Sequence, residues 1–379
     1  AQGSKNQQVS AVSKLPAEFW VRRENSPRKV EGSLPVLNID TMSQMVGSLD
    51  TTNIGVIHDV QLDYYAKRAA AASSDGTIRI WDVTDGRQQQ IGHLKGHEGP
   101  VWKVSWAHPR FGHLLATAGY DMKVIIWKEE RGQWVMAYVD TNHGASINDV
   151  EFAPQEHGLR LACASSDGLV SVLTYSPDGQ WRRSVMQAHP GGAQTVNWAP
   201  VSYRDGVPCG SVRLATGGCD HTVKIWRFEN EVWCEENPRF PYCHTDWVRD
   251  VAWRPDHSSV LATGSWDQTV VIWSQELEGQ AWRQLCKMPV NGKVECLSWS
   301  ITGSMLAVSY GDGMSVIFKE AYDGHFEEVG QIQEAGYTEV PGKLSAPTPG
   351  PGLDAGVPAV TANSELAQQQ QAVLEAFGM

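Results

Sequence analysis

Residues 264–273, GSWDQTVVIW, place an aspartate, Asp267, six residues before a tryptophan, Trp273, and a histidine, His244, lies upstream of both. A carboxylate, an imidazole and a nearby hydroxyl are the groups that acid–base or nucleophilic catalysis uses. The same groups can form a structural network, in which the carboxylate accepts hydrogen bonds from turn N–H groups and from the histidine. The rest of the chain decides between these two interpretations.

The offset of six residues between an aspartate and a bulky residue occurs six times. The pairs are Asp75 with Trp81, Asp121 with Trp127, Asp167 with Leu173, Asp220 with Trp226, Asp267 with Trp273 and Asp312 with Phe318. Successive aspartates lie 46, 46, 53, 47 and 45 residues apart. Catalysis needs one distinctive site, whereas a fixed period is typical of a repeat architecture. The pattern therefore indicates structure.

A histidine is a second marker in the same register. His97, His143, His189 and His244 each lie nine residues before Trp106, Phe152, Trp198 and Trp253, whereas the first and last copies keep the frame at 53–62 and 290–299 without a histidine. We expect the histidine to reach a Ser/Thr hydroxyl and the tryptophan N–H. The expected structural networks are His97 with Asp121 and Trp127, His189 with Asp220 and Trp226, and His244 with Asp267, Trp273 and a hydroxyl of Thr263 or Ser265.

Each copy can supply four strands. In the second copy, 101–106 alternates, 114–119 is apolar and small, 123–127 is β-branched and 133–139 makes an outer strand, with turn residues between these runs. Periods near this length are typical of WD-type propellers. The sequence therefore predicts an all-β fold, a six-bladed WD40-type β-propeller over residues 46–333.

Composition excludes several classes of function. The chain has 379 residues and a net charge of −12, which argues against direct nucleic-acid binding because phosphate attraction needs a basic surface. Its seven cysteines form no CxxC motif, so reduced thiols in a cytosolic or nuclear setting are expected. No 18-residue apolar run occurs, and no basic amphipathic helix predicts contact with lipid.

No enzyme motif is present. The chain contains no G-x-S-x-G, no H-E-x-x-H, no P-loop and no dinucleotide fingerprint. Cys219 with His221, and Cys243 with His244, are possible metal ligands, but their spacing does not match a zinc finger. We expect no catalytic residues, no cofactor, no metal and no small-molecule substrate.

Several segments resemble the Sec-thirteen family of WD-repeat proteins over roughly residues 46–330. The segments that carry the match are IHDVQLDYYAKR (57–68), GHEGPVWKVSWAHP (96–109), KVIIWKEERGQW (123–134), LACASSDGLVSVLTY (161–175), GGCDHTVKIW (217–226) and DWVRDVAWRP (246–255). Leu173 in place of tryptophan in the third copy also fits the pattern of that family.

The resemblance implies a structural scaffold rather than an enzyme. Members of the family have six blades in an open ring, which a partner with an α-helical rod completes by inserting a seventh blade. They serve the outer COPII coat in ER-to-Golgi transport, the Y-shaped scaffold of the nuclear pore and thereby mRNA transport, and a nutrient-signalling complex. The implied locations are the cytoplasmic face of ER exit sites and vesicles, and the nuclear envelope. The alternative from another class is a peptide-binding WD adaptor in a ligase, chromatin or nutrient-signalling complex.

The residues themselves suggest how such a partner could bind. The sixth copy has its own fourth strand at 325–333, so nothing obvious locks the last copy to the first. Uncovered sheet faces are interaction sites, and strand addition by a partner would cover them. The predicted contact residues lie on blade one and blade six: Val56, Ile57, Leu62, Tyr64, Val294, Trp299, Val316 and Phe318.

Two end segments and one loop fall outside the repeats. Residues 1–45 form an arm whose aromatic and β-rich part, 17–39, either pairs as a strand in cis near the seam or is loosely held. Residues 334–379 are rich in Pro, Gly and Ala and predict a disordered tail with a short helix possible at 364–377. The loop 199–213 lengthens the fourth copy as a surface excursion.

Overall fold

The computed structural model describes residues 54–339, except 85–88, 256–258, 312, 323 and 334–335. The arm at 1–45, the helix predicted within 364–377 and nearly all of the predicted tail lie outside the described residues. Almost every described element is a strand. The 3₁₀ turns η4 (Pro109–Phe111) and η5 (Gln155–His157) each lie between the first and second strands of a sheet.

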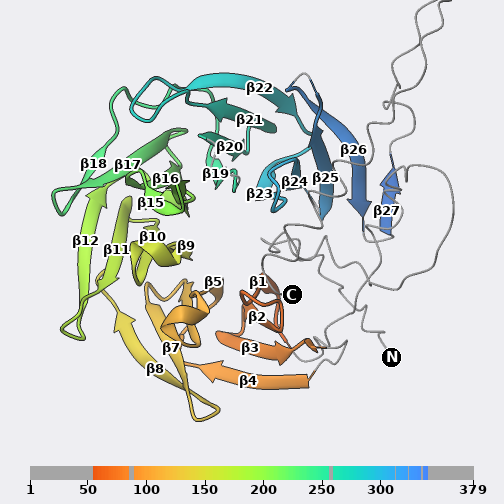
Figure 1. The fold of residues 1–379 in the computed structure, drawn as a ribbon. Coiled ribbons are helices and arrows are strands. Elements are labelled where there is room, and N and C mark those ends of the chain that lie inside the picture. The colour runs from red at the N-terminus through yellow and green to blue at the C-terminus, as the bar shows by residue number, and fades with distance from the viewer. Residues whose placement is uncertain are drawn as a thin grey trace, which may run out of the picture. The chain divides into compact units, whose positions relative to one another are not determined.

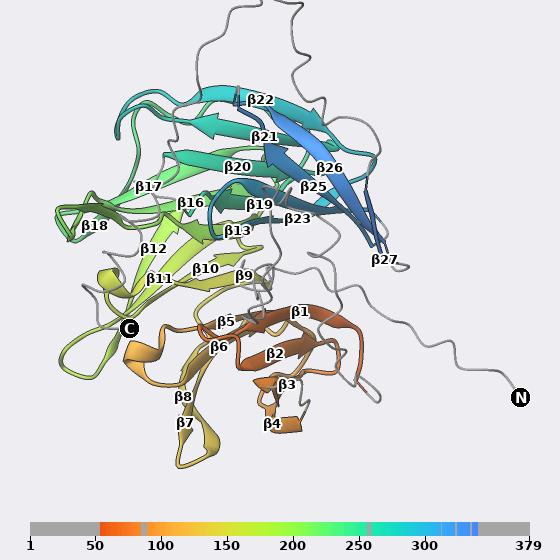
Figure 2. The same ribbon diagram turned by 45° about the vertical axis from the view of Figure 1, so that its right-hand side comes forward.

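Six antiparallel sheets follow one another in chain order (Figures 1 and 2). The first three are β1 (Ile57–Leu62), β2 (Arg68–Ser73), β3 (Thr77–Asp82) and β4 (Gln89–Lys95); β5 (Val101–Trp106), β6 (Leu114–Gly119), β7 (Val124–Glu130) and β8 (Gln133–Asp140); and β9 (Ile147–Phe152), β10 (Arg160–Ser165), β11 (Leu169–Tyr175) and β12 (Trp181–Gln187).

The other three sheets continue this plan. They are β13 (Ala193–Trp198), β16 (Val212–Gly218), β17 (Val223–Glu229) and β18 (Val232–Glu235); β19 (Val248–Trp253), β20 (Val260–Ser265), β21 (Thr269–Ser274) and β22 (Arg283–Pro289); and β23 (Val294–Trp299), β24 (Met305–Tyr310), β25 (Met314–Glu320), β26 (Phe326–Gln333) and β27 (Gly336–Glu339). The first strand of each sheet contacts the first strand of the next, from β1 and β5 through to β19 and β23. The predicted six-bladed β-propeller architecture is therefore found.

Two elements go beyond the sequence prediction. The sixth sheet holds a fifth strand, β27, which pairs with β26 through residues 330–333. The boundary predicted at residue 333 is therefore one strand too short. The loop at 199–213 contains a small hairpin, β14 (Ser202–Arg204) with β15 (Val207–Cys209), which is a sheet of its own.

Each pair of successive sheets shares one apolar core, because alternate residues of a strand point to opposite faces. Five core clusters join sheet one to two, two to three, three to four, four to five and five to six. Among the residues described, no cluster and no strand pairing joins sheet six to sheet one. We call this place the sixth junction.

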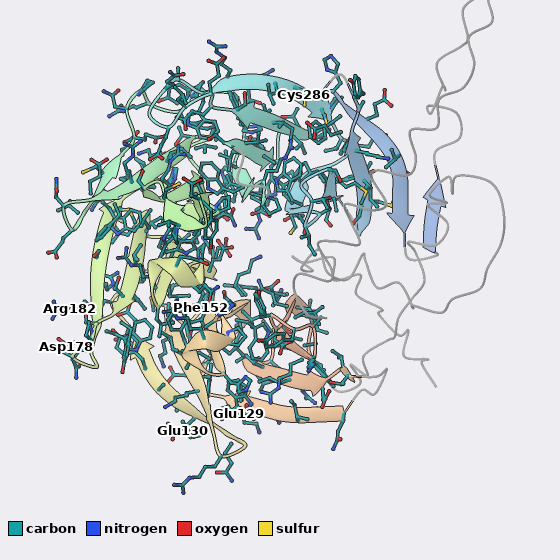
Figure 3. The ribbon with its side chains drawn as sticks, in the orientation of Figure 1. Glu129, Glu130, Phe152, Asp178, Arg182 and Cys286 are labelled. Carbon is teal, nitrogen blue, oxygen red and sulfur yellow. The ribbon has the colours of Figure 1, made fainter. Side chains whose placement is uncertain are left out.

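Ion pairs also form on outer segments of the sheets. Arg68 of sheet one donates to Glu129 of sheet two at 2.6 Å. At the β11–β12 turn, Arg182 donates to Asp178 at 2.7 Å. Figure 3 labels Glu129, Asp178 and Arg182 on these outer segments and Phe152 nearer the centre. The stabilising interior is thus formed by the facing apolar surfaces of the sheets.

Close approach of sheets five and six predicts an effect of one glycine. A Cβ on Gly264 would lie 2.6 Å from Val294 Cγ1 and 3.2 Å from Leu297 Cγ. Overpacking costs about 1–3 kcal/mol, so we expect Gly264→Ala to lower the free energy of unfolding by that amount in urea titrations. Gly144→Ala is the matched control, since its nearest contact would be 3.9 Å away. An equal effect of both changes would contradict this interpretation.

Candidate functional site

The histidine, aspartate, hydroxyl and tryptophan of the repeat meet in the second sheet. His97 Nδ1 lies 2.9 Å from Asp121 Oδ1, and His97 Nε2 lies 2.8 Å from Thr117 Oγ1. The Trp127 indole donates to the same hydroxyl at 2.9 Å. Glu98 N also donates to the aspartate at 3.0 Å. The Asp121 carboxylate therefore joins the histidine to the turn backbone, and the Thr117 hydroxyl joins the histidine to the tryptophan.

Sheets four and five repeat these bonds. The distances are between 2.8 and 3.1 Å for His189 with Asp220 and Thr216, for Trp226 with Thr216, for His244 with Asp267 and Thr263, and for Trp273 with Thr263. The hydroxyl in the fifth sheet is thus that of Thr263. Ser265 instead accepts from Asp267 N at 3.0 Å and donates to Asp246 O at 3.1 Å.

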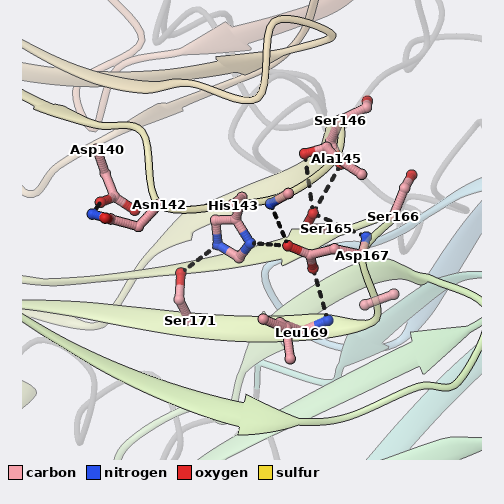
Figure 4. A network of polar contacts seen from close by, with 12 residues as sticks. Asp140, Asn142, His143, Ala145, Ser146, Ser165, Ser166, Asp167, Leu169 and Ser171 are labelled. Atoms are coloured by element: carbon pink, nitrogen blue, oxygen red, sulfur yellow. Dashed lines mark hydrogen bonds and ion pairs between the residues drawn. The ribbon is translucent and has the colours of Figure 1, made fainter.

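The third sheet reaches the same result with different residues (Figure 4). His143 Nδ1 lies 3.0 Å from Asp167 Oδ2, and its Nε2 lies 2.8 Å from Ser171 Oγ. The place of the threonine is taken by Cys163, which is fully buried, and that of the tryptophan by Leu173. The serine one strand further on therefore supplies the hydroxyl.

In the first copy, Asp75 keeps part of the turn contacts without a histidine. Thr77 N and Oγ1 donate to its carboxylate at 2.9 and 2.7 Å. Asp312, the aspartate of the sixth copy, lies outside the described residues. Complete four-residue networks are therefore confined, among the described copies, to sheets two, four and five.

Burial and hydrogen bonding shift the pKa values of the network groups in opposite directions. Burial would raise the pKa of Asp267, but bonds from His244, Thr269 and Thr245 N outweigh it and hold the pKa well below its ordinary value. The pKa of Asp121 is lowered in the same way, against burial, by His97 and backbone N–H groups. Burial lowers the pKa of His143, which favours its neutral form. The aspartates are thus held ionised.

This geometry suits architecture and not catalysis. The side chains of His97, His143, His189 and His244 are 0% exposed, so no substrate can reach the imidazoles. Within the described part of the chain, no group of three or more His, Cys, Asp or Glu residues is arranged to hold a metal. Burial raises the pKa of Cys243 to about 12.

The inner strands carry a second set of contacts, which sequence reasoning missed. We number their residues from position one, which is Ile57, Val101, Ile147, Ala193, Val248 or Val294. At three junctions a position-three carboxylate accepts from the position-four N–H of the next sheet: Asp59 from Val104 at 3.1 Å, Asp149 from Val196 at 3.0 Å and Asp250 from Leu297 at 2.8 Å. These bonds fasten backbone to side chain across successive sheets.

Position five makes an equivalent link to position six. Ser105 accepts from Phe152 N at 3.0 Å, Glu151 from Trp198 N at 2.9 Å and Asn197 from Trp253 N at 2.8 Å. The indoles of Trp106, Trp198 and Trp299 donate to the position-five carbonyls of Gln61, Glu151 and Ala252 at 3.1, 2.9 and 3.0 Å. Position-three side chains therefore join sheets one and two, three and four, and five and six, whereas position-five side chains join sheets two and three, three and four, and four and five.

Position two of the inner strands lines a cavity of about 470 Å³. Every sheet contributes its position-two residue to the lining: His58, Trp102, Asn148, Gln194, Arg249 and Glu295. The Arg249 guanidinium lies 3.3 Å from both Gln194 Oε1 and Glu295 Oε2, and the rings of His58 and Trp102 meet edge-on at 4.5 Å. Sheet six also contributes lining residues at the sixth junction: Ser309, Tyr310, Gly311, Gly313, Met314 and Ser315.

The structure does not bring the eight predicted contact residues together on one surface. Val56 and Tyr64 are exposed and Ile57 lines the cavity, but Leu62 is buried. The four residues predicted on blade six are wrong as contacts, because they pack against sheet five in the shared core: Val294, Trp299, Val316 and Phe318. By strand alternation, it is Ala307, Ser309 and Ile317 that lie on the opposite face, toward the sixth junction.

Loss of one network histidine predicts a measurable destabilisation. His244→Ala removes one hydrogen-bond partner each from Thr263 and Asp267 in a buried site, which costs about 1–3 kcal/mol. We expect chemical denaturation to show this loss. His113→Ala, at an exposed histidine, is the control and should change the free energy of unfolding little. If both variants behave alike, the network does not stabilise the sheet.

The lowered aspartate pKa values predict the sign of the pH dependence. A carboxyl whose folded-state pKa is depressed stabilises the fold above its unfolded pKa, and this stability is lost as the pH falls below about 4. Urea unfolding between pH 7 and 3 should therefore show falling stability with falling pH. Asp267→Asn should be less stable at pH 7 but flatter over this range. A slope as steep as that of the unmodified chain would count against the assignment.

Comparison with known proteins agrees with this geometry. The family description "WD domain, G-beta repeat" matches residues 44–82, 88–128, 170–227 and 237–274, which end near the four repeat tryptophans. A Drosophila melanogaster relative, "Protein SEC13 homolog", is 40% identical over 75% of this chain and 83% of its own length. Relatives called "Protein transport protein SEC13" are 37% identical in Mycosarcoma maydis and 41% identical in Yarrowia lipolytica. The alignments cover 75% and 76% of this chain, and 94% and 99% of those proteins. With buried repeat networks and this degree of identity, the chain belongs to the Sec-thirteen family of WD-repeat proteins.

Proposed function

We propose that this chain is a structural, non-catalytic subunit of protein-transport coats that binds a strand-bearing segment of an α-helical partner at the sixth junction. The names of its relatives support a role in protein and vesicle transport. The observation that carries the finer proposal is that five core clusters join successive described sheets and none joins sheet six to sheet one.

A sheet face needs an apolar cover to be stable in water. The junction faces of the two sheets carry apolar or small side chains, among them Ala69, Ala71 and Trp81 on sheet one and Ala307 and Ile317 on sheet six. Backbone pairing would give a partner strand affinity, and alternate side chains would give it specificity. A subunit that requires a partner to complete its fold makes a stiff assembly unit.

The same device would serve more than one assembly. We propose an outer vesicle coat of the COPII type and the nuclear-pore scaffold as its settings, with partners that supply a seventh blade. The locations that follow are ER exit sites and the nuclear envelope. No helix in the described residues is long and apolar enough to cross a membrane. In this proposal the chain reaches membranes through its assembly and binds neither nucleic acid nor a small-molecule substrate.

One observation favours a second function, that of a WD adaptor that binds peptides. The position-two cavity carries aromatic and charged residues, including Trp102 and Arg249, at one end of the inner strands. Trp247 and Trp266 stack at 4.7 Å on neighbouring loops, with Lys293 over the Trp266 ring at 4.2 Å. Such groups can hold an extended peptide.

The two functions predict opposite outcomes for two variants. We expect Ala307→Arg, on the junction face of sheet six, to abolish retention of helical coat subunits in affinity purification followed by mass spectrometry. A charged side chain there would be buried without a partner under an inserted blade. Val185→Arg, at an exposed position of the outer strand β12, is the control and should retain them.

Trp102→Ala completes the design. Retention of the coat subunits by this variant supports the junction as their binding site. Their loss on Trp102→Ala, with full retention by Ala307→Arg, would contradict the proposal and favour the peptide adaptor.

A further inference from the structure

At each of the five described junctions, position three or position five of one inner strand accepts from position four or six of the next, and this indicates what a strand at the sixth junction would carry. Such a strand would follow sheet six, so its position-four and position-six N–H groups would face Cys296 and Ser298, the residues at positions three and five. It would also precede sheet one, so its own position three or position five should be an acceptor. Position one is aliphatic or alanine in all six inner strands, and position four is valine or leucine.

Residues 36–41, VLNIDT, carry this pattern. Val36 matches position one, Asn38 and Asp40 supply acceptors at three and five, and Ile39 is the aliphatic residue at four. Thr41 departs from the pattern, because position six is Leu, Phe or Trp in the inner strands. We propose that residues 36–41 bind at the sixth junction as an inner strand supplied by the chain itself, and that an incoming partner strand must displace them.

Asn38 suits the side chains that would flank it. In the inner ring, position three alternates between carboxylates, at Asp59, Asp149 and Asp250, and donors, at Lys103, Thr195 and Cys296. Thr195 Oγ1 lies 3.0 Å from both Asp149 and Asp250, so neighbouring position-three side chains touch. A residue between Cys296 and Asp59 meets a donor on one side and a carboxylate on the other. An amide both accepts and donates, and it satisfies both neighbours.

Burial at the junction supports a cover supplied by the chain. Ala69, Ala71 and Trp81 point away from sheet two, since Ala70, Ala72 and Ile80 fill the core with that sheet. None of the five core clusters includes Ala69, Ala71 or Trp81. They are nevertheless only 1%, 2% and 2% exposed. An empty junction would leave such a face open to water.

The connection is long enough. An inner strand of six residues spans about 20 Å. If this strand runs parallel to β1, the chain after Thr41 must cross back over roughly the same length to begin β1 at Ile57. Twelve residues separate Thr41 from Ile54, and they can span up to about 40 Å.

The test uses a native thiol. Because position-three side chains of successive sheets touch, Asn38→Cys in the full-length chain should lie beside Cys296. We expect a short bifunctional thiol reagent to join the two, with a yield at least about tenfold above that with any other cysteine, since a seated strand raises the effective concentration. Peptide mapping identifies the joined pair, and Cys296→Ser in the same background should remove it.

The chain contains its own controls, because Cys209 and Cys234 are exposed. Equal joining of Asn38→Cys to these two thiols, or no joining at all, would overturn the proposal. A link to Cys296 of a second molecule, seen as a covalent dimer, would assign the junction to another copy and would also overturn it.

A second measurement keeps this test separate from that of the proposed function. Ile39→Asp should lower the melting temperature of the isolated chain and abolish the Asn38→Cys link, while leaving partner binding intact or stronger. Loss of partner binding by Ala307→Arg without any Asn38→Cys link would support the inserted blade and reject the cis strand.

Discussion

Backbone N–H groups that face a neighbouring sheet are the constraint on which this fold depends. An inner strand uses one edge to pair within its own sheet, and N–H groups on its other edge point toward the preceding sheet. A buried donor left unsatisfied costs about 1–3 kcal/mol. Asp59, Asp149 and Asp250 meet these groups from position three, and Ser105, Glu151 and Asn197 meet them from position five. At each of the five described junctions, a side chain of one sheet therefore satisfies a backbone donor of the sheet that follows it.

The histidine networks solve a different problem, that of holding the turns. The aspartate accepts from the turn backbone, and the histidine carries the connection inward to a hydroxyl and the indole. Buried bonds of this kind are rigid because each group has its partner. Because the networks hold the turns of a sheet in place, its inner strand is held in place as well. The same positions of neighbouring inner strands therefore face each other at each junction. The histidine networks thus fix the turns within each sheet, and the inner-strand contacts then join one sheet to the next.

The sequence was sufficient for the periodic features and insufficient for those that depend on which face a side chain occupies. Six copies and the groups of the networks follow from spacing, which a chain cannot vary without losing register. Val294 and Phe318 were placed on the wrong face, although alternation with Glu295 and Lys319 could have shown it. The acceptors at position five were missed because three different residue types, serine, glutamate and asparagine, accept the equivalent hydrogen bond, so no single residue recurs in the sequence. Recurrence of aspartate at 59, 149 and 250 was a signal that could have revealed position three. The strand β27 left no periodic trace, since it is four residues long and has no counterpart in other copies.

Parity limits what can occupy the sixth junction. Six position-three residues alternate between acceptor and donor without conflict, but a seventh residue must break the alternation. A carboxylate there would lie beside Asp59, and two adjacent carboxylates cannot both stay ionised at low cost. A lysine would donate a hydrogen bond to Asp59, but its ammonium has no acceptor for the Cys296 thiol. A residue that both donates and accepts, such as asparagine, glutamine, serine or threonine, fits both neighbours. The same requirement falls on any strand that enters, whether it comes from this chain or from a partner, so the competing strands should share this chemistry at one position.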